Sequence, residues 1–241
     1  MAFFLISGTR RTGKDVLASS LLSDSKSLSD SKSLSDSKVL SDNSKEIKPW
    51  LVYKGRKDWI YPSKNSHRMA FAYGVKLEVS KNLGLDISIM DSSAKDTMMI
   101  EGKLLREYLI ELAMERKEKD PSYWVKDTLK RLPNKANNSN IYKPMCPEAI
   151  YRGSEDVIIT DFRFLLAECL YLENLGYDVL SMRVFRSDVH IPTKEEDPLG
   201  VEHDLDSFPC DFLLVTSHEE FEKAVKLYPQ YSSYVDSGIV I

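Results

Sequence analysis

The segment from Phe3 to Leu22 constrains the fold of this chain more than any other. Phe3 to Ser7 is a short, continuous apolar run, which is typical of a strand buried on both faces of a parallel sheet. Gly8 and Gly13 bracket the loop that follows, and Lys14 to Leu22 has apolar side chains at helical spacing. A buried strand that passes through such a loop directly into a helix predicts the start of a βαβ unit.

Strand-like and helix-like segments continue to alternate along the chain. Further strands are expected at residues 68–73, 157–160, 178–185 and 212–216. Further helices are expected at 104–117, at 122–132 with Ser122 as N-cap, at 164–175 ending at Gly176, and at 218–227. Strands separated by helices pair in parallel, so we expect one domain over residues 1–241 with a three-layer α/β/α fold.

A repeated unit of six residues interrupts this pattern. It begins as Leu22-Ser-Asp-Ser-Lys-Ser and starts again at Leu28, Leu34 and Leu40. Each unit has one leucine among mostly Ser, Asp and Lys residues, so burial cannot offset the entropy of ordering the segment. We expect residues 23–46 to be a disordered insertion without catalytic residues; a tail regulated by serine phosphorylation is the alternative.

The composition excludes several classes of protein. The net charge of -4 over 241 residues argues against nucleic-acid binding as the main role. Cys146, Cys169 and Cys210 lie far apart, which favours neither a zinc site nor a disulfide framework. No run of ~18 apolar residues suggests a membrane span. We expect a protein of the cytoplasm, or of the host cytoplasm if the chain is viral, without a membrane partner.

The loop after the first strand carries specific chemistry. Gly8 and the Gly13-Lys14 pair match the spacing of the phosphate-binding loop (P-loop), GxxxxGK[ST]. Such glycines let backbone N–H groups point at phosphate oxygens, while Lys14 bridges the β- and γ-phosphates. The expected ATP-binding residues are Arg11, Thr12, Gly13, Lys14, Asp15 and Val16.

Asp15 departs from the P-loop template, in which a hydroxyl contacts Mg²⁺. A carboxylate is a good ligand for this hard cation and can hold it directly or through water. We therefore expect Asp15 to bind Mg²⁺. The alternative is a strand-to-helix turn that binds no ligand.

The Gly-Lys-Asp loop and three further segments resemble a known family. The segments are Arg106 to Ala113 with the following Asp120 to Lys126 (DPSYWVK), Val157 to Phe164 (VIITDFRF), and Glu202 to Val215. Together they resemble the deoxynucleoside monophosphate kinases of phages and large DNA viruses, and the related animal-type phosphomevalonate kinases. Two positions depart from the family pattern: Ala113 replaces a glycine, and Glu168 stands one position later than the usual acid.

The resemblance implies a phosphotransferase with ATP and Mg²⁺ that converts deoxynucleoside monophosphates to diphosphates, as precursors for DNA synthesis. The expected catalytic residues are Lys14, Asp15 and Arg163. The expected acceptor-binding residues are Lys76, Arg106, Ala113, Trp124, Asp161, Arg163 and Glu168. Transfer to another small phosphorylated acceptor, as in phosphomevalonate kinase, and a P-loop protein that binds ATP without catalysis are the alternatives.

The resemblance also implies an organisation of the chain. Residues 68–132 are the expected acceptor-binding region, and residues 186–209 are the expected lid, which excludes water during transfer. A homodimer is a reasonable expectation. Taken alone, Trp124 fits a helix core as well as a stacking position, Lys76 and Arg106 fit a solvated surface, and Asp161 with Arg163 fits an ion pair at a turn.

Overall fold

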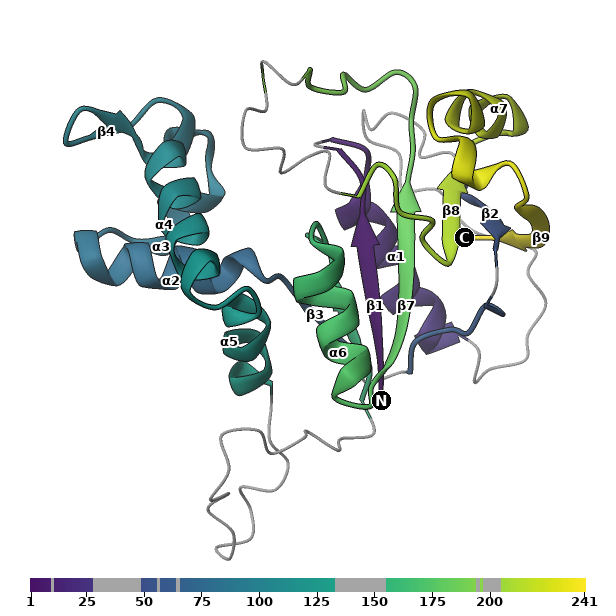
Figure 1. Cartoon of the computed structure of the whole chain (residues 1–241), viewed down its shortest axis with the longest axis horizontal. Helices are drawn as coiled ribbons and strands as arrows, with labels where there is room; N and C mark the ends of the chain where they lie inside the picture. Colours follow the sequence, from purple (N-terminus) through teal and green to yellow (C-terminus); the bar gives the residue numbers. More distant parts are fainter. Residues whose placement is uncertain are drawn as a thin grey trace, which may run out of the picture.

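The computed structural model describes residues 1–9, 11–27, 49–55, 57–63, 66–132, 155–193, 196 and 205–241. These residues form an α/β fold around a seven-stranded sheet (Figure 1). Its strands are β1 (Ala2–Ser7), β2 (Leu51–Lys54), β3 (His67–Met69), β6 (Val157–Ile159), β7 (Asp178–Val184), β8 (Phe212–Val215) and β9 (Val235–Val240). They lie in the order β3-β6-β1-β7-β8-β2-β9.

The sheet is mostly parallel. β1 pairs in parallel with β6 and β7, and β3 and β8 extend the parallel set on either side. β2 is antiparallel to both of its neighbours, β8 and β9, so it alone runs against the other strands of this sheet. The expectation of a parallel sheet is thus confirmed for its central strands, and the antiparallel edge is an addition to it.

Strand β1 is buried on both faces, as its apolar run predicts. Phe3 and Leu5 pack into one core, while Phe4 and Ile6 pack into a second core on the other face. Helix α1 (Lys14–Ser27) contributes Leu17 and Leu21 to the second core, and α6 (Tyr171–Asn174) contributes Leu172 to the first. Helices thus cover both faces of the sheet, which is compatible with a three-layer α/β/α arrangement.

A group of helices lies beside the sheet, next to its edge strand β3 (Figure 1). It consists of α2 (Ala72–Leu83), α3 (Ile87–Asp91), α4 (Leu105–Lys119) and α5 (Tyr123–Arg131). A 3₁₀ turn, η1 (Ser93–Asp96), and a hairpin of β4 (Met99–Ile100) and β5 (Lys103–Leu104) connect α3 to α4. We call α2 to α5 the helical lobe; it coincides with most of the expected acceptor-binding region.

The C-terminal part closes the other end of the sheet. Helix α7 (His218–Leu227) has the predicted bounds, and the 3₁₀ turn η4 (Pro229–Tyr231) follows it. α6 is preceded by a π-helical turn, η3 (Leu165–Leu170), and Gly176 then takes a φ of 82°, as predicted for a helix C-cap. Among the described residues, no helix has the length and apolarity needed to cross a membrane.

Several expectations differ from the structure. The strand predicted at 68–73 is only His67–Met69, because the chain turns into α2 at Ala72. Ser122 stands at the N-cap position of α5, but its hydroxyl donates to Asp120 and caps no helix N–H. α1 runs to Ser27, so the first residues of the expected disordered insertion are helical; residues 28–48 lie outside the described residues.

The buried position of Phe4 gives a test of this fold. Phe4→Ala leaves a cavity between β1 and α1, because Phe4 has no solvent exposure. We expect its free energy of unfolding to fall by about 3–5 kcal/mol in urea denaturation. Leu227→Ala, at a half-exposed position of α7, is the control and should change it by less than about 1 kcal/mol. Equal effects of the two substitutions would contradict the two-sided burial of β1.

Candidate functional site

The loop after β1 has the backbone geometry that its glycines predict. Gly8 has a φ of 142°, and a Cβ at this position would lie 2.6 Å from the Val184 carbonyl oxygen. Gly13 has a φ of 97° and lies against the Trp50 ring, which a Cβ would approach to 3.1 Å. Arg11 also has a positive φ, of 70°. Neither glycine position admits a side chain without strain, so the loop conformation depends on both.

The Lys14 side chain folds over this loop. Its Nζ donates to the carbonyl oxygens of Gly8, at 2.6 Å, and Thr9, at 2.7 Å. The Thr12 hydroxyl also donates to the Thr9 carbonyl oxygen, at 2.9 Å. The ammonium group therefore lies over the loop at the N-terminus of α1, where a helix favours negative charge. These residues fit a bound polyphosphate chain. Arg10 lies outside the described residues.

Asp15 lies in the first turn of α1 and is 73% exposed at its side chain. Its carboxylate accepts a hydrogen bond from the guanidinium of Arg68 in β3, so the P-loop helix is tied to the edge of the sheet. Over the described ranges, no three His, Cys, Asp or Glu residues are grouped to hold a metal. Asp15 fits Mg²⁺ as a single protein ligand, because this ion commonly keeps waters and binds substrate phosphates. Binding the ion would replace the contact with Arg68.

A cavity of about 240 Å³ lies between the helical lobe and the turn that follows β6. Its walls come from α2, α4, α5, the turn and η3. The lining residues are Phe71, Ala72, Val75, Lys76, Leu109, Ile110, Ala113, Met114, Lys117, Trp124, Asp161, Arg163, Phe164 and Glu168. Aromatic and aliphatic side chains predominate among them, with a few charged groups, as is usual for a small-molecule site.

The structure brings most of the expected acceptor-binding residues together here. Six of them line this cavity: Lys76, Ala113, Trp124, Asp161, Arg163 and Glu168. They come from α2, α4, α5, the turn after β6 and η3. Arg106 does not line the cavity: it lies near the start of α4 and its guanidinium pairs with Asp96 of η1. It shares the helix face of Ile110, one turn away, and of Ala113, two turns away.

Asp161 joins the sheet to the helical lobe. Its carboxylate accepts hydrogen bonds from the backbone N–H groups of Phe71, at 2.8 Å, and Ala72, at 2.7 Å. N–H groups at the start of a helix have no acceptor within the helix, and the N-cap residue of α2 provides no side-chain cap. Asp161 takes that place. Asp161, expected to bind the acceptor, therefore caps the start of α2 and also lines the cavity.

Glu168 is buried, with 3% exposure, and supports the same turn. Its Oε2 accepts hydrogen bonds from the backbone N–H groups of Arg163, at 2.8 Å, and Phe164, at 3.1 Å. The Lys117 ammonium lies 3.6 Å from its Oε1. Burial raises the pKa of Glu168 to about 7, against the opposing effects of Lys117 and of these N–H groups.

Trp124 lies in the core and also lines the cavity. It is 3% exposed and belongs to the core that contains Phe3 and Leu5. The indole Nε1 donates to the carbonyl oxygen of Ala113, at 3.0 Å. Ala113 therefore orients Trp124 through its backbone, which a glycine at this position can also do. Lys76, on α2, reaches the cavity and pairs with Asp91 of α3.

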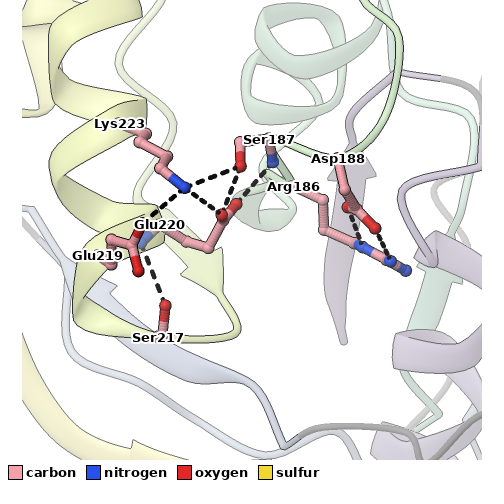
Figure 2. Close-up of polar contacts among 7 residues, drawn as sticks. All are labelled: Arg186, Ser187, Asp188, Ser217, Glu219, Glu220 and Lys223. Carbon is pink, nitrogen blue, oxygen red and sulfur yellow. Dashed lines mark hydrogen bonds and ion pairs between the residues drawn. The ribbon is translucent and has the colours of Figure 1, made fainter.

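Both ends of the expected lid are fixed to the body of the protein. At its start, Ser187 donates to Glu220 of α7 through its backbone N–H, at 2.6 Å, and its hydroxyl, at 2.5 Å (Figure 2). Arg186 forms a two-point ion pair with Asp188 (Figure 2).

At the other end of the lid, Arg183 of β7 donates to the Leu205 carbonyl oxygen, at 2.8 Å, and to Asp206, at 2.6 Å. Arg183 itself is buried. Part of the expected lid lies outside the described residues, namely residues 194, 195 and 197–204.

Comparison with models of known protein families finds no match, and neither does a search of curated proteins. A function for this chain is therefore inferred from the positions of its loop and cavity residues.

Lys117, Phe71 and Phe164 are cavity residues that the sequence analysis missed. Lys117 lies four residues after Ala113, so it shares the same face of α4, and this spacing was a usable signal. Phe71 directly precedes α2, and Phe164 ends the 161–164 turn. No sequence pattern indicated that they line the cavity, because their positions depend on how the end of β6 meets α2.

The buried Glu168 carboxyl predicts a dependence of stability on pH. Its pKa is raised on folding from 4.5 to about 7, so the folded state favours the neutral form. The resulting stability is present below pH 4.5 and is lost as the pH rises through about 7. Over this window, we expect the wild type to lose about 3 kcal/mol of unfolding free energy relative to the double variant Glu168→Gln, Lys117→Met. Parallel stability curves for the two proteins in urea titrations would contradict this assignment.

Proposed function

We propose that this chain has a P-loop kinase fold and transfers the γ-phosphoryl group of ATP to a deoxynucleoside monophosphate. The observation that carries the proposal is the convergence of Lys76, Trp124, Asp161, Arg163 and Glu168 on one cavity. The resemblance predicts these residues from separate segments of the chain, and they line a common site.

The positions of the two sites support transfer between them. β1 and β6 are parallel neighbours, so the P-loop and the 161–164 turn emerge at the same edge of the sheet. The Phe162 N–H donates to the carbonyl oxygen of Ile6, at 3.2 Å, directly before this loop. Ligands of open α/β sheets bind outside the carboxyl ends of the strands. A donor on the P-loop and an acceptor in the cavity would therefore lie on the same side of the molecule.

The roles of the residues follow from phosphoryl transfer. An oxygen of the acceptor phosphate attacks the γ-phosphorus in line, and ADP leaves. Lys14 offsets the charge on the transferred group, and Arg163 provides a two-pronged guanidinium for the acceptor phosphate. Mg²⁺ near Asp15 would supply further positive charge between the phosphates. Lys76 adds a cation at the cavity wall.

The cavity walls favour a nucleotide as acceptor. Phe71, Trp124 and Phe164 all line the cavity, and aromatic faces of this kind stack on nucleobases. An aliphatic acceptor such as phosphomevalonate would gain burial in this cavity but no stacking.

A turnover assay tests the proposal. The protein is incubated with Mg-ATP and each deoxynucleoside monophosphate, or with phosphomevalonate, and release of ADP is measured. We expect turnover with at least one deoxynucleotide and none with phosphomevalonate. Lys14→Met should lower the rate by about 10²- to 10³-fold or more, because it removes charge stabilisation of the transferred group.

Lys81→Met is the matched control for this loss, since Lys81 is exposed in the last turn of α2, and it should leave the rate unchanged. A wild-type protein that turns over none of the nucleotides would refute the kinase proposal. Full activity of Lys14→Met would show that the loop has been assigned the wrong role.

A further inference from the structure

Lys117 is a buried cation at the floor of the cavity. It lies in the C-terminal part of α4, and its side chain is only 13% exposed. Its ammonium lies 2.7 Å from the centroid of the Phe164 ring and 3.6 Å from Glu168 Oε1. Burial of a lysine is costly unless a partner offsets the loss of hydration, so Lys117 and Glu168 depend on each other.

Glu168 connects Lys117 to the 161–164 turn. Its Oε2 receives two backbone N–H groups, those of Arg163 and Phe164, while its Oε1 faces Lys117. Glu168 is also only 3% exposed, so its side chain offers little surface for direct contact with a substrate. An ionised carboxylate accepts such hydrogen bonds more strongly than a neutral one. The charge state of Glu168 therefore affects how firmly the Arg163 backbone is held.

The turn is held from the opposite side as well. Asp161 binds the start of α2, two residues before Arg163. Between these two contacts, the Arg163 side chain lines the cavity. Loss of one contact would let the guanidinium shift, and a displacement of about 1 Å can cost as much as 10²-fold in rate.

We propose that Lys117 is a positioning residue: acting through Glu168, it holds the 161–164 turn so that Arg163 faces the acceptor. This proposal rests on the proposed function for the identity of the acceptor. It adds Lys117 to the residues that determine acceptor binding, and it assigns Glu168 to the turn in place of direct substrate contact.

The charged groups around Glu168 determine how the pair responds to pH. Lys117 faces it from α4, Asp161 and Arg163 from the turn, and Lys76 lines the same cavity from α2. Asp161 disfavours the ionised form of Glu168, and Lys117 favours it. Protonation of Glu168 weakens the turn, so acceptor KM should rise as the pH falls below about 7.

Two variants separate charge from packing. Lys117→Met keeps an unbranched apolar side chain under Phe164 but removes the charge, and Lys117→Arg keeps the charge. We expect Lys117→Met to raise the KM for the acceptor about ten- to a hundredfold, with the KM for ATP unchanged. The rise in acceptor KM should begin at a higher pH, because the ammonium no longer favours ionised Glu168. Lys117→Arg should restore most of the acceptor affinity.

Lys119→Met is the matched control, since Lys119 is an exposed residue near the end of α4 that pairs with Glu115, and its kinetics should match the wild type. An equal rise of both KM values in Lys117→Met, or an unshifted pH profile, would overturn the positioning role. So would a Lys117→Arg variant as impaired as Lys117→Met.

Amide hydrogen exchange provides a readout that needs no acceptor. The N–H groups of Arg163 and Phe164 should exchange faster in Lys117→Met than in the wild type, while those of β1 keep their protection. Unchanged exchange would overturn the proposal, whatever the acceptor is. Faster exchange in Lys117→Met, together with a wild type that turns over no acceptor, would support the action of Lys117 on the turn. The same result would refute the kinase proposal but not the positioning proposal.

Discussion

The contact of Asp161 with the start of α2 is the interaction on which the site depends. Parallel strands β3 and β6 end at the same edge, and Asp161 follows β6 while Phe71 and Ala72 follow β3. A carboxylate that satisfies two N–H groups at a helix N-terminus also interacts favourably with the helix dipole. It orients α2 relative to the sheet, and with it the wall that carries Lys76. The cavity lies at this junction, and Phe71, Ala72 and Asp161 all line it.

The second constraint is the concentration of positive charge at the same edge. Lys14 lies over the carbonyl oxygens of the P-loop, and Arg163 lines the cavity one strand away. Lys14 donates to loop carbonyls, which are weaker partners for an ammonium group than the phosphate oxygens of the proposed donor. Asp15 and Arg68 form a further pair whose partners are both exposed, so this contact contributes little to stability.

The sequence predicts the central sheet and most of the cavity wall, and the reasons for its failures are physical. Apolar runs such as Phe3 to Ser7 are buried on both faces, so their signal is strong. Neither β2 nor β9 was predicted: β2 is only four residues long, and β9 is an edge strand whose exposure makes its apolar pattern weak. The role of Asp161 could not be derived either, since a helix cap supplied from 89 residues further along the chain leaves no local pattern.

Lys117 and Glu168 illustrate what buried charge contributes to such a site. Replacing a buried ion pair by apolar residues is often neutral or stabilising, so stability alone gives little reason to retain this one. The raised pKa of Glu168, about 7, reflects that cost directly. In the proposed role, the pair fixes the orientation of the 161–164 turn. The Glu168 carboxylate accepts hydrogen bonds from two N–H groups of the turn, and the Lys117 ammonium, on α4, offsets the charge of that carboxylate. An apolar pair could not accept the hydrogen bonds that Glu168 accepts from the Arg163 and Phe164 N–H groups.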